Sequence, residues 1–342
     1  MGKEINNSSA NAQSNGWTFE YAAALIIYLE NMNDATSFCV EGSDDIVVCL
    51  KNSKIVAQAK SSLKQDEIIA NHFSEIIESI RTLAQNDDAV ELISISNFHA
   101  PLGQNDSFSF GQFLDKRSYS KLTTASQNRI KSKCNELGYA IDFQKFKLWF
   151  LRFEGDCPEL GIQEYLKSKL SKIKFSDEFP MNDLMNQWLH IIQLNGRDRC
   201  KVIETETMCG TLFGKILANT NLEKITRLIK EDIDPCYEDS FGGFFKEYFS
   251  KNSQNFRIYS EIAYAFIDYA NKYRPTNNEK YEIFAKYYCD RHSCPTVITE
   301  YFSGYEERDE LASSLYRLFI AYVCFKKEAI ASIRKAFGYE NN

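Results

Sequence analysis

Two runs of β-forming residues around a short polar turn constrain the fold of this chain most strongly. Residues 46–50 read Ile-Val-Val-Cys-Leu and residues 55–57 read Ile-Val-Ala, with the turn Lys51-Asn-Ser-Lys54 between them. Apolar runs rich in β-branched residues on both sides of a polar turn are typical of a β-hairpin. The sequence therefore predicts a hairpin at the centre of its N-terminal part.

Further helical and strand patterns surround this hairpin. Apolar spacing predicts helices over residues 17–32 and 66–85, and residues 118–137 are expected to form a polar helix. The runs over residues 90–95 and 146–153 are expected to be strands. We therefore expect residues 16–155 to form an α/β domain, restriction-endonuclease-like in type, with a mixed sheet flanked by helices. Residues 1–15 are polar and are expected to form a flexible tail.

The second half of the chain has a different character. Helical patterns recur over residues 162–173, 182–194, 222–229, 259–273, 280–288 and 310–337. Five of the six prolines fall between these patterns, where proline ends a helix without breaking it: Pro158, Pro180, Pro235, Pro275 and Pro295. A length of 342 residues suits two domains. Residues 156–342 are therefore predicted to form an all-helical domain for partner binding or oligomerisation.

The polar residues of the hairpin are predicted to converge on one face. Pairing Leu50 with Ile55 places Asp45 opposite Lys60. Opposed residues of an antiparallel pair share a face, and Gln58 shares it with Lys60 because side chains alternate with a period of two. A register slip of one residue would bring Asp44 to this face in place of Asp45.

This polar group suits metal-assisted hydrolysis of a phosphodiester bond. The carboxylate of Asp45 and the amide oxygen of Gln58 are hard oxygen ligands of the kind that Mg²⁺ takes. The ammonium of Lys60 can orient a nucleophile or neutralise charge in the transition state. Glu20 of the preceding helix is a candidate for a second negative charge, and the carbonyl of Ala59 is a further candidate ligand. Two purely structural alternatives remain. Asp44 and Asp45 would then belong to a solvated turn, and Gln58 and Lys60 to the polar face of a half-exposed strand.

The order of these short motifs resembles the PD-(D/E)xK nuclease superfamily, in its Mrr-like form with Gln in place of an acid. The motifs are Gly16-Trp-Thr-Phe-Glu20, Glu41-Gly-Ser-Asp44-Asp45, Gln58-Ala-Lys60 and, at the end of the next predicted strand, Ile95-Ser96-Asn97. Residues 14–155 are similar to the double-stranded-DNA endonuclease domain of bacterial anti-phage effectors of the CBASS type. The nuclease subunit of Lamassu-type defence complexes carries the same domain.

The resemblance implies a role for each residue of the group. Asp45, Gln58 and Lys60 take the core catalytic positions, and Glu20 is the acid of the helix. Asp45, Gln58, Ala59 and Glu20 would hold Mg²⁺, or Mn²⁺ in its place. The implied activity is metal-dependent cleavage of double-stranded DNA by the effector of a prokaryotic defence complex.

The second half departs from the nucleotide-sensing effectors, whose sensor domain is an α/β fold. A helical second half disfavours activation by a cyclic oligonucleotide and favours activation by a protein partner or by oligomerisation. An SMC-like ATPase is the partner that the Lamassu resemblance implies. The active form is expected to be a homo-oligomer.

Basic residues gather after the predicted active site. They are Lys116, Arg117, Lys121, Arg129, Lys131 and Lys133, against the single acid Asp115. A face that binds nucleic-acid phosphates is one interpretation. An ordinary solvated helix is equally compatible with the pattern.

Composition excludes some classes of protein. A net charge of −7, with 15 Lys and Arg against 19 Asp and Glu in residues 1–154, excludes a generally basic nucleic-acid coat, so DNA would need a local groove. The ten cysteines are scattered without a preceding signal sequence, which favours reduced thiols in the cytoplasm. The longest apolar run, Ala22 to Leu29, is too short for a membrane span.

Two alternatives to a DNA endonuclease remain open at this point. The first is a non-catalytic nucleic-acid-binding or scaffold subunit built on a degenerate nuclease fold. The second is an effector that cleaves RNA. A nuclease assay with partner proteins present separates them.

Overall fold

The structure is a computed structural model, and its backbone contacts divide into two units. The first unit comprises Met1–Ser171 and Met181–Thr205, and the second comprises Lys172–Pro180 and Glu206–Asn342. The residues that the structure describes are 7–41, 45–62, 70–98, 102, 106, 112–153, 158–173, 179–197, 201–218, 240–245, 247–248, 256–276 and 279–339.

A mixed seven-stranded sheet forms the centre of the first unit, in the order β5-β6-β4-β3-β2-β1-β7. The strands are β1 (Ala35–Glu41), β2 (Asp45–Leu50), β3 (Lys54–Lys60), β4 (Glu91–Ser96), β5 (Leu114–Ser118), β6 (Phe146–Leu151) and β7 (Ile203–Glu204). The strands β3, β4 and β6 run parallel, and the other neighbours pair antiparallel. The expected mixed sheet is therefore present.

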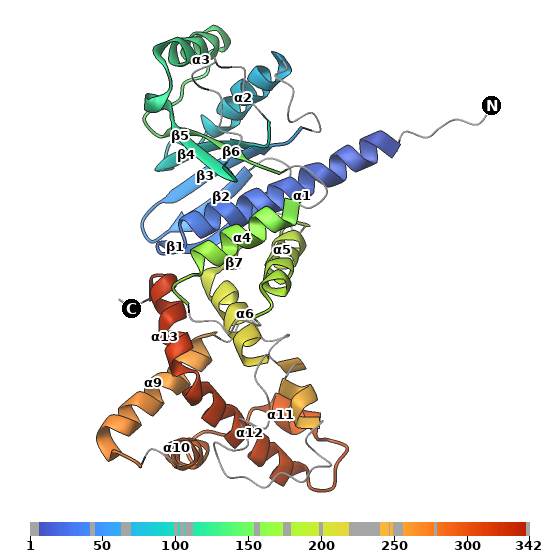
Figure 1. Cartoon of the computed structure of the whole chain (residues 1–342), viewed down its shortest axis with the longest axis vertical. Helices are drawn as coiled ribbons and strands as arrows, with labels where there is room; N and C mark the ends of the chain where they lie inside the picture. Colours follow the sequence, from blue (N-terminus) through green and yellow to red (C-terminus); the bar gives the residue numbers. More distant parts are fainter. Residues whose placement is uncertain are drawn as a thin grey trace, which may run out of the picture. The chain divides into compact units, whose positions relative to one another are not determined.

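Helices cover both faces of this sheet (Figure 1). They are α1 (Asn7–Glu30), α2 (Ala70–Leu83), α3 (Thr124–Leu137), α4 (Pro158–Lys169) and α5 (Met181–Arg197). Helix α1 contacts β1, β2 and β3, and α4 and α5 pack on α1. Helices α2 and α3 contact each other, and α2 lies on β3 and β4. The strand β3 is consequently buried on both faces.

One hydrophobic core lies between the sheet and the helices α2 and α3. Val56, Leu92 and Leu148 contribute to it from neighbouring strands, together with Ile77 of α2 and Ile130 of α3. Because side chains alternate along a strand, Ile55 and Ala57 must belong to the opposite face. That face is the one on which α1 packs.

The register of the hairpin differs from the predicted one. Val48 lies opposite Ile55 and Cys49 opposite Lys54, so Leu50 does not pair with Ile55. The amide of Leu50 donates to the carbonyl of Ser53 (2.7 Å), which tightens the turn to two residues. The shift along β3 is two residues, so every side chain keeps its predicted face.

Two boundaries also differ from the sequence-based expectation. Helix α1 begins at Asn7, so residues 7–15 belong to a helix and not to a tail. The first unit extends well past residue 155, because α4 and α5 pack on α1 and the strand β7 pairs with β1. β7 places one strand within the half that was expected to be all-helical.

The second unit is helical in the part that the structure describes. Its helices are α6 (Thr205–Ala218), α9 (Phe256–Tyr273), α10 (Lys280–Cys289), α11 (Thr296–Tyr301), α12 (Arg308–Phe325) and α13 (Lys327–Ala336). The helix expected over residues 310–337 is divided at Lys326, and the one expected over residues 222–229 lies outside the described residues. Across the described helices, none has both the length and the apolar character needed to cross a bilayer.

Candidate functional site

Polar side chains occupy the carboxyl end of β3, on the face that α2 covers. Gln58 pairs with Ser94 of β4, and Lys60 pairs with Ser96. Paired residues of neighbouring strands share a face, so these four belong to one polar group. Asp45 is the first residue of β2, directly before Ile46, which lies opposite Ala57. The backbone register places Gln58 and Lys60 on one face, and the convergence of Asp45 with them stays a prediction.

Gln58 is the most unusual member of this group. Its side chain is fully buried, and neither its amide nitrogen nor its amide oxygen has a hydrogen-bond partner among the described residues. A buried polar group without a partner costs about 1–3 kcal/mol of stability. Ala59 lies between Gln58 and Lys60 and pairs with Ile95 of β4. An unsatisfied buried amide calls for an explanation, and a bound ion or water or a catalytic role is among those that proteins provide.

Glu75 of α2 is a member of the site that sequence reasoning missed. Burial raises the pKa of the Glu75 carboxyl, and the positive charges of His72 and Lys60 lower it only in part. Its Oε2 atom is buried and accepts no hydrogen bond from a described residue. The available signal was its position one helical turn after His72, beside the apolar stripe of this helix.

A pair of hydrogen bonds holds the chain in place directly after Lys60. The amide of Ser62 donates to Oδ1 of Asn97 (2.7 Å), and Nδ2 of Asn97 donates to the carbonyl of Ser62 (3.1 Å). Nε2 of His72 lies 3.3 Å from the hydroxyl of Ser62, and the His72 ring stacks on Phe98 with centroids 4.2 Å apart. The first turns of α2 are thereby held over the ends of β3 and β4.

Glu20 lies on a different side of the sheet. It is a buried residue of α1, the helix that packs against the face of Ile55 and Ala57. Gln58 and Lys60 belong to the opposite face. The structure therefore does not place Glu20 in the same face group as Gln58, and its role as a metal ligand stays a prediction.

The residues present partly fit a hard divalent cation. In the described ranges, no three side chains of His, Cys, Asp or Glu gather closely enough to hold a metal ion. The oxygens near Lys60 are instead the amide oxygen of Gln58 and the carboxylate of Glu75, both with an unsatisfied buried atom. Asp45 is the further carboxylate ligand that the sequence predicts. Such a set suits Mg²⁺, which prefers oxygen ligands and keeps several waters.

The predicted nucleic-acid-binding residues are divided between the two faces of the sheet. In β5, Lys116 lies opposite Trp149 and Arg117 opposite Leu148, so the two side chains alternate. Lys116 forms an ion pair with Glu30 of α1. Arg117 bonds to Asp115 (2.9 Å) on the other face. These two residues consequently do not form one continuous surface.

The remaining four basic residues belong to the short helix η2 (Tyr119–Lys121) and to α3. Lys133 pairs with Glu136 (2.6 Å), and the guanidinium of Arg129 lies over the ring of Phe73 of α2 (4.2 Å). Lys121 and Lys131 are exposed and form no ion pair with a described residue. Contact of Lys121 and Lys131 with nucleic acid stays a prediction.

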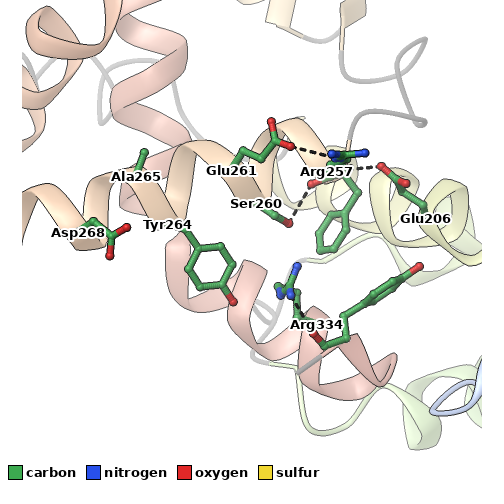
Figure 2. Close-up of a pocket in the computed structure, with 10 residues that line it drawn as sticks. Glu206, Arg257, Ser260, Glu261, Tyr264, Ala265, Asp268 and Arg334 are labelled. Atoms are coloured by element: carbon green, nitrogen blue, oxygen red, sulfur yellow. Dashed lines mark hydrogen bonds and ion pairs between the residues drawn. The ribbon is translucent and has the colours of Figure 1, made fainter. Parts of the chain in front are cut away.

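The second unit contains a separate cavity of about 940 Å³ along helix α9 (Figure 2). The guanidinium of Arg334 lies 5.1 Å from the ring centroid of Tyr264 and 5.9 Å from that of Tyr339. Arg257 bonds to Glu261 through Nε (2.9 Å). The lining carries both signs of charge, from Glu206, Glu261, Asp268, Arg257 and Arg334. Three acidic and two basic side chains therefore line this cavity.

No known family profile and no curated protein matches this sequence. Among solved structures, the chain is similar to the Cap4 SAVED/CARF-domain containing receptor of Moraxella osloensis (15% identity, 56% of this chain and 46% of that chain, TM-score 0.36). It is also similar to the Acinetobacter baumannii Cap4 receptor with the cyclic trinucleotide 2'3'3'-cAAA (14% identity, 66% and 48% covered, TM-score 0.38). The chain spans about half the length of these solved chains. TM-scores of this size do not establish a common fold.

Proposed function

We propose that this chain is a metal-dependent endonuclease that hydrolyses phosphodiester bonds of double-stranded DNA. The observation that carries the proposal is the fully buried amide of Gln58, unsatisfied among the described residues and two positions from Lys60. A fold gains nothing from such an amide, so a ligand is the natural explanation for it. The order of Glu20, Asp45, Gln58 and Lys60 along the chain matches the nuclease resemblance.

The residues of the group divide the work of hydrolysis between them. The oxygens of Gln58 and Asp45 would hold Mg²⁺, which when bound lowers the pKa of a coordinated water and stabilises negative charge on the phosphate. The ammonium of Lys60 balances the charge that develops on the phosphate oxygens. The pair of bonds between Ser62 and Asn97 fixes the backbone after Lys60, so its side chain starts from a defined position.

We further propose that the chain is the effector subunit of a prokaryotic anti-phage defence complex. This part rests on the sequence resemblance of residues 14–155 to the endonuclease domains of such systems. The helical unit would bind a protein partner, with an SMC-like ATPase as the expected class, or a second copy of the chain. Control by assembly suits an enzyme whose substrate is also the host chromosome.

A plasmid-nicking assay tests the activity. The full chain, alone and assembled with its copurifying partners, is incubated with supercoiled plasmid and Mg²⁺. We expect nicking that a chelator abolishes and that Lys60→Ala reduces by at least about a hundredfold, as for loss of a major electrostatic contact in a transition state. Lys54→Ala is the matched control, because Lys54 begins the same strand and forms an ion pair with the surface residue Asp88 (3.0 Å).

Three results would overturn or redirect the proposal. Undiminished cutting by the Lys60→Ala protein would remove Lys60 from the catalytic group. Retarded DNA without cleavage, in every assembly and with either Mg²⁺ or Mn²⁺, would favour the scaffold alternative. Cleavage of RNA beside intact DNA would assign the site to a ribonuclease.

A further inference from the structure

The N-terminal turns of α2 lie over the carboxyl ends of β3 and β4. His72 contacts Ser62, which follows β3, and stacks on Phe98, which follows β4. Glu75 is one helical turn further along α2, and its charge interacts with those of His72 and Lys60. The helix therefore brings a carboxylate to the same end of the sheet as the amide of Gln58.

Two buried polar atoms that lack a described partner thus belong to residues beside Lys60, one on α2 and one on β3. Oε2 of Glu75 accepts no hydrogen bond from a described residue, and neither does Oε1 of Gln58. Gln58 is completely buried, so its oxygen is satisfied neither by the described residues nor by bulk water. Burying an isolated carboxylate is costlier than burying an amide. A cation bound between these two oxygens would offset both costs at once.

The number of negative ligands that a magnesium site needs also points to Glu75. Gln58 supplies a neutral oxygen, so Asp45 would be the single negative ligand on this face. Magnesium sites in proteins are usually built on one or two carboxylates. Glu20 has been the candidate for the second, but it belongs to the helix on the opposite face of the sheet. Glu75 lies on the helix that covers Gln58 and Lys60.

We propose that Glu75 is the second carboxylate ligand of a divalent cation held with Gln58 and Asp45. The inference rests on the proposed function, because it concerns the metal of that site. Gln58 stands where the nuclease motif usually has an acid, and Glu75 of the following helix would supply that carboxylate instead. In this arrangement His72 is a positioning residue: its bond to Ser62 and its stacking on Phe98 fix the turn of α2 that carries Glu75.

Binding of Mn²⁺ to the full chain tests this assignment without any nuclease assay. Titration calorimetry is carried out on the wild type and on the variants Glu75→Gln, Glu75→Asp, Glu78→Gln and Glu20→Gln. Glu78 is the matched control, because it lies on the same helix and forms an exposed ion pair with Arg81. We expect Glu75→Gln to weaken Mn²⁺ binding by at least about tenfold to a hundredfold. Mutating a residue that only hydrogen-bonds to a metal ligand already has an effect of that size. Glu75→Asp should lose less, while Glu78→Gln binds like the wild type.

The outcomes separate the inference from the proposed function. If the wild type binds Mn²⁺ and Glu75→Gln binds it equally well, Glu75 is not a ligand and only this inference fails. Loss of binding in Glu20→Gln but not in Glu75→Gln would likewise return the second carboxylate to α1. If the wild type binds no Mn²⁺ at millimolar concentration, the metal site itself is absent and both proposals fail. Thermal unfolding without metal shows whether each variant is folded. If Glu75→Gln does not fold, the Mn²⁺ affinity of Glu75→Asp is compared with that of the wild type instead.

Discussion

Asn97 and Ser62 hold each other by two hydrogen bonds, one in each direction. The amide of Ser62 donates to Oδ1 of Asn97 at 2.7 Å, and Nδ2 of Asn97 donates to the carbonyl of Ser62 at 3.1 Å. The side chain of Asn97 thereby replaces the strand pairing that ends with Lys60 and Ser96. The buried amide of Asn97 therefore holds the chain directly after the proposed catalytic group.

Replacing Asn97 with Leu, which has a similar volume, should destabilise the protein. The backbone groups of Ser62 lose both partners in a setting where Asn97 is only 3% exposed. Each unsatisfied buried group costs about 1–3 kcal/mol, so we expect the free energy of unfolding to fall by about 2–4 kcal/mol. Urea unfolding measures it. Asn195→Leu is the control, because Asn195 makes a single bond within its own helix (2.7 Å) and should cost less.

Glu30 joins three elements of the first unit through one carboxylate. It forms ion pairs with Lys116 of β5 and Lys169 of α4, and it accepts a hydrogen bond from the hydroxyl of Tyr165. Burial alone would raise the pKa of Glu30, but the hydrogen bonds and charges of Lys116 and Lys169 outweigh it and hold the pKa below its usual 4.5. The ionised form of Glu30 therefore stabilises the folded state.

This stabilisation should depend on pH with a definite sign. A carboxyl group whose pKa is lower in the folded state contributes fully above its unfolded pKa, and the contribution is lost as the pH falls through the folded pKa. We expect Glu30→Gln to lower the free energy of unfolding by about 2 kcal/mol at pH 7, as for hydrogen bonds to a charged group. The difference from the wild type should shrink below pH 4.5. For the exposed residue Glu136, the same substitution should show little difference at any pH. A difference for Glu30→Gln that grows on acidification would contradict this account.

The faces of the hairpin could be predicted from the sequence because they depend only on the period of two. Ile46 and Val48 are buried on one face, and Gln58 belongs to the other, as the alternation requires. The register itself could not be predicted, since it depends on where the turn closes. A hydrogen bond from Leu50 to Ser53 closes it within two residues.

Helix α6 was missed because its local sequence disfavours a helix. It contains Gly210, Gly214 and Thr211, residues of low helix propensity. Met208 and Phe213 are fully buried, so tertiary packing stabilises the helix. Glu75 was missed for a related reason. Its position one helical turn after His72 can be read from the sequence, but the approach of Lys60 from the adjacent strand depends on the tertiary fold.

Gln58→Met should separate stability from activity. Methionine fills about the same volume without an amide, so the unsatisfied buried atoms of Gln58 disappear. We expect the free energy of unfolding to rise by about 1 kcal/mol while DNA cleavage is lost. Asn97→Leu is the contrasting case, because it also removes a buried amide, but one with partners. A loss of stability in Gln58→Met would show that the fold itself satisfies this amide.

The basic residues of η2 and α3 should contribute to the salt dependence of DNA affinity. Lys121 and Lys131 are exposed and unpaired within the described part of the chain, so each is available to a phosphate. Every phosphate contact releases counterions and adds about 0.9 to the slope of log affinity against log salt concentration. The double variant Lys121→Gln and Lys131→Gln should therefore lower the slope by up to about 2, measured by fluorescence anisotropy with a labelled duplex.

Lys116→Gln is the matched control for this measurement. Lys116 was also expected to bind nucleic acid, yet its ammonium pairs with Glu30 on the opposite face of the sheet. Its loss should lower the free energy of unfolding by about 1 kcal/mol while the salt slope stays within error of the wild type. An unchanged slope in the double variant, with a lowered slope in Lys116→Gln, would place DNA against the α1 face. That result would also favour Glu20 over Glu75 as the acid nearest to the phosphate, because the two residues lie on opposite sides of the sheet.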